Sequence, residues 1–471
     1  MKRIMISAMQ SGSGKTIVSC GLMTALKKRG LSVAGFKCGP DYIDPMFHTR
    51  VLGIPSRNMD LYLQGEAGVR RTLEKTRADI AVLEGAMGFY DGVNRTSDAS
   101  AWDVARITDT PVILVLRPSG QSLSLAAQVR GMQAFREPSH IAGLLLNNVK
   151  PSMYKSMKEM LERETGLPVV GFLPPMEEAV LSSRHLGLVT AEEITDICDR
   201  FEAVAEAMEQ YADLDKLLSL ATGKRMDNSL FESPAVFGEA VHDDFERTNA
   251  LKTDAGCEKK ASPLCRIAAA RDEAFSFYYQ DNLDALAAAG AEIVSFSPIH
   301  DARLPEADGL YLGGGYPELY KKELSGNASM RDEIRTVVKR GMPVVAECGG
   351  FLYLQQDLCG TDPMAGVLPG SGFRTEHLRR FGYLTLRAES DSLLFRAGEE
   401  IPAHEFHYWD SSDCGDALAA WKADGRSWRC GFTSDTMYAA FPHLHWGGKL
   451  PMAERFVRAA VRYHEGKSAA G

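Results

Sequence analysis

The segment RIMISAMQSGSGKT, residues 3–16, decides the fold of the N-terminal half. An apolar, β-rich run leads into a glycine- and serine-rich loop, and the helix-forming stretch TIVSCGLMTALKKRG follows. A strand, such a loop and a helix in this order are the context of a P-loop, where backbone N–H groups surround phosphate oxygens. The pattern departs from the usual one at Met9, six residues before the lysine, where glycine is expected. The predicted ATP-binding residues are Ser11, Gly12, Ser13, Gly14, Lys15 and Thr16.

Apolar runs alternate with helix-forming stretches along the rest of this half. The runs are SVAGFKCG, DIAVLEGAMG, PVILVLRP, IAGLLLNNV and PVVGFLP. Strands this apolar are buried on both faces, which is typical of a parallel sheet covered by helices on both sides. The pattern predicts an α/β fold with a doubly wound P-loop domain over residues 1–211. Ligands of such sheets bind at the carboxyl ends of the strands.

Charged side chains follow two of these strands. Glu84 ends the strand in DIAVLEGAMG, where a carboxylate can hold Mg²⁺, although an acidic residue there is often only a helix N-cap. The segment KCGPDYIDPMFH, residues 37–48, supplies polar groups for nucleotide or acceptor, unless its aspartates are simply solvated in a turn. Spacing does not separate the two aspartates. The predicted phosphate or substrate contacts are Lys37, Asp41, Tyr42 and Asp44, and the predicted Mg²⁺ ligands are Thr16, Asp44 and Glu84.

The pattern changes in the middle of the chain. Residues 212–263 are polar and show no sustained periodicity, so we expect an interdomain linker there. From Arg266 the alternation of strands and helices resumes. A second α/β domain is therefore predicted over residues 264–462.

A cysteine in the second domain has the setting of a nucleophile. The strand PVVAE runs into Cys348, Gly349 and Gly350, and the helix-forming stretch FLYLQQDL follows. A nucleophile on a sharp strand-to-helix turn is exposed, and the helix N-terminus is expected to lower the pKa of its thiol. None of the other eight cysteines has this setting.

Two further segments supply partners for this thiol. LGGGYPE follows another strand and offers N–H groups to an oxyanion, unless it is only a flexible loop; Gly314 and Gly349 are the predicted donors. AAFPHLHW supplies two candidate bases, of which we prefer His443 to His445. The remaining candidates are His404 and His407 in HEFHYW.

Composition excludes several classes of function. The formal net charge of −9 gives no general attraction to nucleic acid or to an anionic membrane. No apolar run is long enough to span a bilayer, and no signal peptide is recognisable. Nine scattered cysteines without a CxxC pair are typical of a reduced, cytoplasmic protein. The expected partners are small molecules, and a homodimer is compatible with the sequence.

The motifs together resemble those of one known family. The chain resembles the cobyrinic acid a,c-diamide synthase family over nearly its whole length. The resemblance is carried by five segments in this order: SGSGKT, KCGPDYIDPMFH, LSSRHLGLV at residues 181–189, ECGGFLYL and the HEFHYW to HLHW region. The resemblance implies a dethiobiotin synthetase-like N-terminal domain and a flavodoxin-like C-terminal domain of the class I glutamine amidotransferases. Such an enzyme is a glutamine-hydrolysing carbon–nitrogen ligase.

The resemblance also implies a division of chemistry. Cys348 would attack the carboxamide of glutamine and release ammonia, with His443 as acid and base. The P-loop site would use ATP and Mg²⁺ to convert an acceptor carboxylate into an acyl phosphate, which ammonia aminates. The implied acceptor is cobyrinic acid, amidated at its a- and c-acetates in cobalamin biosynthesis; hydrogenobyrinic acid and nickel sirohydrochlorin are alternatives. Many class I enzymes carry Glu two residues after the histidine, where this chain has His445, so no third triad member is assigned.

Two other functions compete with this one. One is a dethiobiotin synthetase-like carboxylase with a regulatory second domain, against which the ECGGFLYL turn argues. The other is a non-amidating P-loop ATPase of the partitioning type. Such ATPases usually have a second lysine near the start of the loop, where this chain has Met9 and Gln10, and they have no use for a cysteine on a sharp turn.

Overall fold

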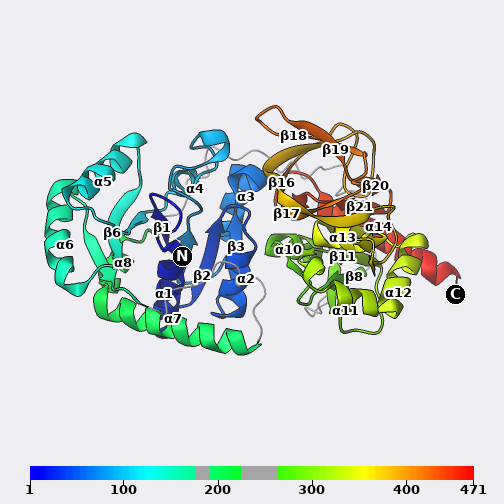
Figure 1. Cartoon of the computed structure of the whole chain (residues 1–471), viewed down its shortest axis with the longest axis horizontal. Helices are drawn as coiled ribbons and strands as arrows, with labels where there is room; N and C mark the ends of the chain where they lie inside the picture. Colours follow the sequence, from blue (N-terminus) through cyan, green and yellow to red (C-terminus); the bar gives the residue numbers. More distant parts are fainter. Residues whose placement is uncertain (177–190, 224–261, 471) are drawn as a thin grey trace, which may run out of the picture. The chain divides into compact units, whose positions relative to one another are not determined.

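The computed structural model describes residues 1–176, 191–223 and 262–470, which fall into two compact units (Figure 1). The first unit comprises Met1–Lys224 with the short segments Phe277–Asp281 and Ala423–Gly425, and the second unit holds the other described residues. The segment at 181–189, part of the family resemblance, lies outside the described residues. Within the described ranges, no helix is both long and apolar enough to cross a membrane.

A seven-stranded parallel sheet forms the centre of the first unit, in the order β3-β2-β4-β1-β5-β6-β7. The chain leaves β1 toward β2 and β3 on one side, and leaves β4 toward β5, β6 and β7 on the other. The carboxyl ends of β1 and β4 therefore lie where the winding changes direction, the usual ligand position in such sheets. The strands are β1 Lys2–Ala8, β2 Val33–Cys38, β3 Ser56–Met59, β4 Ile80–Glu84, β5 Val112–Leu116, β6 Ile141–Asn147 and β7 Val169–Leu173.

Helices connect these strands and bury their apolar residues against them. One core joins α1, α7 and α8 to alternate residues of the central strands, which confirms the predicted doubly wound α/β fold. The helices are α1 Lys15–Lys28, α2 Ile43–Arg50, α3 Leu61–Lys75, α4 Ala101–Ile107, α5 Leu123–Phe135, α6 Pro151–Thr165, α7 Ala191–Tyr211 and α8 Leu214–Leu220, with the 3-10 turn η1 Val93–Arg95.

The last helix of this unit corrects one predicted boundary. We expected a linker from residue 212 onward, but α8 follows α7 directly, and its Leu214 and Leu217 are buried in the same core. The first unit therefore continues past the predicted end of its domain. The remainder of the predicted linker, residues 224–261, lies outside the described residues.

The second unit contains a six-stranded sheet in the order β10-β8-β11-β13-β21-β20, parallel except at β20. Helices accompany it as expected for an α/β domain. The strands are β8 Cys265–Ala270, β10 Ala291–Phe296, β11 Gly309–Leu312, β13 Val344–Glu347, β20 Phe432–Ser434 and β21 Met437–Ala440. The helices are α10 Gln280–Ala288, α11 Lys321–Gly326, α12 Ala328–Lys339, α13 Gly349–Leu354 and α14 Met452–Ala470, with the 3-10 turn η2 Pro317–Leu319.

A second sheet in this unit was not predicted. It is built around two long antiparallel strands, β16 and β17, of which β17 carries the HEFHYW motif and also pairs with β22. Its strands are β14 Asp357–Leu358, β15 Asp362–Pro363, β16 Ser371–Ala388, β17 Glu400–Ser411, β18 Leu418–Trp421, β19 Ser427–Cys430 and β22 His443–Leu444. A separate two-stranded sheet pairs β9 Phe275–Phe277 with β12 Gly314–Gly315.

Candidate active sites

The predicted phosphate loop connects β1 to α1 at the carboxyl edge of the first sheet. Gly12 and Gly14 have φ angles of 77° and 92°, in the left-handed region that favours glycine. The Ser13 hydroxyl donates to the carbonyl oxygen of Gln10 at 3.0 Å and closes the turn. α1 begins at Lys15, so the N–H groups of its first turn are available to an anion.

Two residues outside the motif support this loop. Asn147, the last residue of β6, donates through its side-chain amide to the carbonyl oxygen of Ser13 at 2.9 Å. A Cβ at Gly14 would lie 2.0 Å from the same amide nitrogen, and the φ of 92° is strained for a residue with a side chain, so this position favours glycine. Arg117 donates to the carbonyl oxygen of Gly12 at 3.1 Å. The motif gave no sign of these contacts, because they depend on the ends of β5 and β6.

The P-loop lysine is held by backbone oxygens. The Lys15 ammonium donates to the carbonyl oxygens of Gln10 and Met87 and is largely buried. Burial and, to a lesser extent, the nearby positive charge of Lys37 lower the pKa of Lys15 to about 8. Phosphate oxygens at this loop would restore a full positive charge, because they would replace neutral carbonyls with anionic partners.

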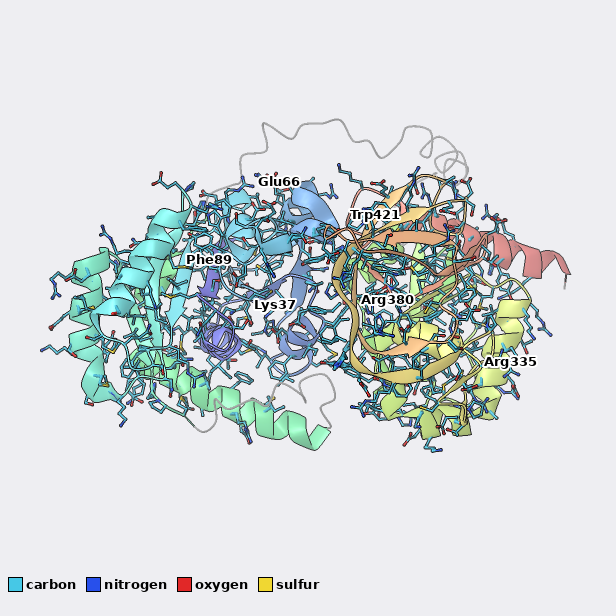
Figure 2. All side chains as sticks on the ribbon, turned by 45° about the horizontal axis from the view of Figure 1, so that its top comes forward. Lys37, Glu66, Phe89, Arg335, Arg380 and Trp421 are labelled. Atoms are coloured by element: carbon cyan, nitrogen blue, oxygen red, sulfur yellow. The ribbon has the colours of Figure 1, made fainter. Side chains whose placement is uncertain are left out.

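A buried ion-pair cluster lies beside the loop. Lys37 on β2 is directly opposite Glu84 on β4 in the sheet register, and its ammonium donates to Glu84 Oε1 at 2.7 Å. The same ammonium donates to Asp44 at the start of α2. The Thr16 hydroxyl, in the first turn of α1, donates to Glu84 Oε1 at 2.7 Å. Four elements therefore converge on one point inside the first unit, where Figure 2 labels Lys37.

Burial and pairing set the charges of this cluster. Burial opposes the charge of Lys37, but Glu84 and Asp44 outweigh it and hold the pKa of the ammonium well above its usual value. Burial likewise opposes ionisation of Asp44, yet Lys37 brings the pKa of this carboxyl below its usual range. For Glu84 burial prevails, and its pKa rises to about 7. Asp44 is therefore ionised at neutral pH, whereas Glu84 titrates near neutral pH.

The cluster has the donors that Mg²⁺ prefers. Thr16, Asp44 and Glu84 offer a hydroxyl and carboxylate oxygens, which are hard ligands. Glu84 Oε2 is buried without a hydrogen-bond partner, and His48 Nε2 lies 3.7 Å from it. His48 is fully buried, and burial lowers its pKa to about 4, so its ring is neutral. An unsatisfied carboxylate oxygen beside a neutral imidazole fits a divalent cation.

The geometry separates the two aspartates that spacing left together. Asp41 accepts the backbone N–H of Ile43 at 2.8 Å, so it shapes the turn before α2, whereas Asp44 joins the ion-pair cluster. Burial, together with the charge of Asp44, raises the pKa of Asp41 to about 6. Tyr42 stands at the N-cap position of α2 and is half-buried.

In the second unit, Cys348 stands on a strained turn between β13 and α13. Its φ of 49° and ψ of −100° lie in a region that few residues with a side chain adopt. Its N–H donates to the carbonyl oxygen of Ala440 on β21 at 2.9 Å. A Cβ at Gly350 would lie 2.1 Å from the carbonyl oxygen of Leu312, so the turn requires glycine at this position.

Two expectations for this thiol are wrong for the free enzyme: Cys348 is buried rather than exposed, and its pKa is not lowered. Burial raises the pKa of Cys348, and the charges of Glu318 and Glu405 raise it further. A hydrogen bond from the Gly349 N–H lowers it, but by less. α13 has only six residues, so its N-terminus gives limited help. The thiol therefore needs a base to become a nucleophile.

The glycine run lies against the nucleophile turn. The N–H of Gly350 donates to the carbonyl oxygen of Gly313 at 2.9 Å. A Cβ at Gly349 would lie 2.9 Å from Pro317 Cδ and 3.0 Å from the backbone nitrogen of Gly315. Gly314 is buried in β12, between Gly313 and Gly315, which make these contacts. The two segments predicted to supply the oxyanion donors are thus brought together.

The four candidate histidines make different contacts. His443 Nδ1 lies 3.6 Å from Oε2 of Glu347, the residue before Cys348. His445 Nδ1 instead accepts the backbone N–H of Gly447 at 3.1 Å. His404 pairs with His443 across β17 and β22, and His407 Nε2 contacts Glu405 at 3.2 Å. His443 therefore contacts Glu347, a residue that the motifs did not single out, and the choice of His443 as the base stays a prediction.

Comparisons with known proteins agree with this division. A family described as the CobQ/CobB/MinD/ParA nucleotide binding domain matches residues 4–188, and one described as the CobB/CobQ-like glutamine amidotransferase domain matches residues 266–450. The cobyrinate a,c-diamide synthase of Clostridium acetobutylicum is 37% identical over 97% of this chain and 100% of its own. Those of Listeria innocua and Salmonella typhimurium are 38% and 36% identical, each over at least 95% of both chains.

The fold and the two sites define an enzyme that joins a nucleotide-binding domain to a glutamine amidotransferase domain. Sequence identity to the relatives over nearly their full length then identifies the family within this class of enzymes. The chain belongs to the cobyrinate a,c-diamide synthase family of carbon–nitrogen ligases, as the resemblance of its motifs predicted.

Proposed function

We propose that this enzyme amidates the a- and c-acetate carboxylates of cobyrinate, with glutamine as nitrogen donor and ATP as energy source. The observation that carries the proposal is the presence of both candidate sites in one chain that matches cobyrinate a,c-diamide synthases over their full length. The name of these relatives favours cobyrinate over hydrogenobyrinate or nickel sirohydrochlorin. A cytoplasmic location and a homodimer stay predictions.

The glutaminase half-reaction belongs to Cys348. His443 accepts the thiol proton, and the thiolate attacks the side-chain carboxamide of glutamine. The N–H groups of Gly314 and Gly349 stabilise the oxyanion of the tetrahedral intermediate. Its collapse breaks the C–N bond, His443 returns the proton to the departing nitrogen, and ammonia leaves behind a γ-glutamyl thioester. Water then hydrolyses the thioester to glutamate and restores Cys348.

The synthetase half-reaction belongs to the P-loop. A carboxylate is a poor electrophile, so an acceptor oxygen attacks the terminal phosphoryl group of ATP and becomes a leaving group as acyl phosphate and ADP form. Lys15 and Lys37 neutralise charge on the phosphates, and Asp41 and Tyr42 lie beside the acceptor. Thr16, Asp44 and Glu84 would hold Mg²⁺, which stabilises charge on the transferring group. Ammonia displaces phosphate and forms the amide.

The test separates the two half-reactions. Cys348→Ala should abolish glutamine hydrolysis and glutamine-dependent amidation, while ammonium salts restore ATP-dependent amidation of cobyrinate. Product amides, glutamate and phosphate would be measured with either nitrogen source. Cys359, an exposed thiol away from the turn, supplies a control as Cys359→Ala, which should behave as wild type. Glutamine-dependent amidation that survives in Cys348→Ala would refute the assignment of the nucleophile.

A further inference from the structure

We infer that Glu347, the residue immediately before the nucleophile, is the carboxylate that positions His443 and completes the glutaminase site. The inference rests on the proposed glutaminase role of Cys348 and His443. It supplies a group for which the sequence offered no candidate, because His445 occupies the position two residues after His443 where a glutamate was expected.

Glu347 is buried and held on both carboxylate oxygens. Its side chain is 1% exposed at the end of β13. Oε1 accepts the backbone N–H of Leu444 at 3.2 Å, and Oε2 accepts the Tyr311 hydroxyl at 3.4 Å. Oε2 also lies 3.6 Å from His443 Nδ1. One carboxylate therefore contacts both the backbone and the imidazole of the short strand β22.

A neighbouring amide fixes the same strand from another direction. Asn282 is fully buried and donates to the carbonyl oxygen of Leu444 at 2.9 Å and to the Tyr311 hydroxyl at 3.2 Å. Its side-chain oxygen accepts the backbone N–H of Trp446 at 2.8 Å. The backbone around His443 is thus held without Glu347, so the carboxylate is not needed merely to keep the strand in place.

The position of the carboxylate determines what the imidazole can do. A negative charge beside Nδ1 favours a proton on that nitrogen, which leaves Nε2 as the base for the Cys348 thiol. The same charge stabilises the imidazolium that forms when the thiol proton is taken up. The distance of 3.6 Å is long for a hydrogen bond and would shorten as positive charge develops.

Other charged groups near His443 do not provide this function. His404 on β17 faces His443, and its pKa is lowered to about 3 by burial, then by His443 and Lys422, so its ring is neutral. Lys422 adds a positive charge to this neighbourhood. Glu405 is committed to Arg380 and His407. Among the groups that these contacts identify, Glu347 is the carboxylate that meets the imidazole.

Glu347 has two opposite effects on the thiol, and they make the inference testable. Directly, its negative charge raises the pKa of Cys348, though by less than burial, Glu318 or Glu405. Indirectly, it stabilises the protonated His443 that accompanies the thiolate. If Glu347 positions His443, the indirect effect must exceed the direct one. Glu347 contacts His443, whereas its direct effect on the pKa of Cys348 is small beside that of burial.

The decisive experiment is the pH dependence of Cys348 alkylation by iodoacetamide in the full chain, followed by mass spectrometry of the peptide that contains Cys348. Glu347→Gln keeps an oxygen for the Leu444 N–H, removes the charge and replaces the oxygen that faces His443 with an amide NH2 group. We expect alkylation at neutral pH to slow by about tenfold or more, with its midpoint moved to higher pH. Glutaminase kcat should fall by about 10²- to 10⁴-fold with KM nearly unchanged.

Two variants control for structural damage. Tyr311→Phe removes the hydroxyl from Oε2 but keeps the carboxylate, and should change kcat by less than about threefold because only a weak hydrogen bond is lost. Glu347→Asp keeps the charge and should recover part of the rate even if Glu347→Gln folds poorly. Ammonium-driven amidation should stay at the wild-type level in all three, since the P-loop site is untouched.

The outcomes separate this inference from the proposed function. Alkylation of Glu347→Gln that is unchanged or faster at neutral pH would overturn the positioning role, because the direct effect would then prevail. A Tyr311→Phe variant as impaired as Glu347→Gln would also overturn it, since the network rather than the charge would matter. Failure of wild type to amidate cobyrinate would reject the proposed function and leave the alkylation result to decide the role of Glu347.

Discussion

The buried charges beside the phosphate loop depend on their partners for stability. Lys37, Asp44 and Glu84 are buried together, and each would be strongly disfavoured as an isolated ion. Removing one partner from such a group destabilises a protein by about 3–5 kcal/mol, because a buried charge remains. In the proposed synthetase site the carboxylate oxygens that hold Lys37 would bind Mg²⁺, and the Lys37 ammonium would face the phosphates.

The Asp44→Asn variant tests this cluster. The substitution keeps the size of the side chain. It removes the negative charge that pairs with Lys37 and one carboxylate ligand of the predicted Mg²⁺ site. We expect amidation with ammonium to fall by about 10- to 100-fold or more, as for other disturbed metal sites. Glutamine hydrolysis by the second unit should persist. Equal loss of both activities would contradict separate roles, and Asp215→Asn, at an exposed carboxylate, is the matched control.

A buried histidine predicts how stability depends on pH. The pKa of His48 is lowered from 6.5 to about 4 by burial, so the unfolded chain takes up a proton at higher pH than the folded one. Stability contributed by the neutral ring is complete above pH 6.5 and is lost as pH falls toward 4. The loss amounts to about 3 kcal/mol by linkage.

Urea unfolding over this pH range would measure the effect. His48→Gln should show a shallower fall of unfolding free energy with decreasing pH than wild type. His300, whose side chain is 62% exposed, provides the control variant His300→Gln. Parallel pH profiles for wild type and His48→Gln would show that burial of this ring does not contribute to acid sensitivity.

At the scale of elements, strand-to-helix turns place the reactive groups. Gly14 in the P-loop and Gly350 after the nucleophile both lie where a Cβ would collide, with a side-chain amide at 2.0 Å and a backbone carbonyl at 2.1 Å respectively. A backbone clash is the harder to relieve, because a strand would have to move. The glycines therefore set the direction in which each loop presents its reactive side chain.

Gly350→Ala should abolish most glutamine hydrolysis, because the methyl group must displace either β11 or the nucleophile turn. We expect a loss of at least about 100-fold, comparable to removing an oxyanion donor, and a lower melting temperature. The control is Gly326→Ala at the end of α11, where a Cβ would have nothing within 4 Å. Near-normal hydrolysis by Gly350→Ala would mean that the turn relaxes more easily than its packing suggests.

Elements also show what a sequence can predict. The parallel sheets were predictable, because RIMISA and PVVAE are apolar runs followed by glycine-rich turns. The sheet around β16 and β17 was not, since β16 is rich in polar residues and its pairing shifts register beside Arg379. Asn147 and Glu347 were also missed, because their contacts join strands that are distant in sequence and follow no local motif.

At the scale of the whole molecule, function depends on two chemistries in one chain. A phosphate loop alone is common to many enzymes, and a cysteine turn alone indicates only a nucleophile. Both sites occur in this chain, and the chain matches cobyrinate a,c-diamide synthases over nearly their full length. Together these observations support the proposed ATP-dependent amide synthase. We therefore propose that the two sites serve one reaction, in which ammonia from glutamine aminates the acceptor that the P-loop site activates.

Mass spectrometry of cobyrinate incubated with the purified enzyme, glutamine, ATP and Mg²⁺ tests this claim most directly. We expect two successive exchanges of a carboxyl group for an amide, each with ATP consumed and glutamate released. Nitrogen-15 from amide-labelled glutamine should appear in both new amides. Consumption of glutamine and ATP while cobyrinate keeps its mass would contradict the proposed function.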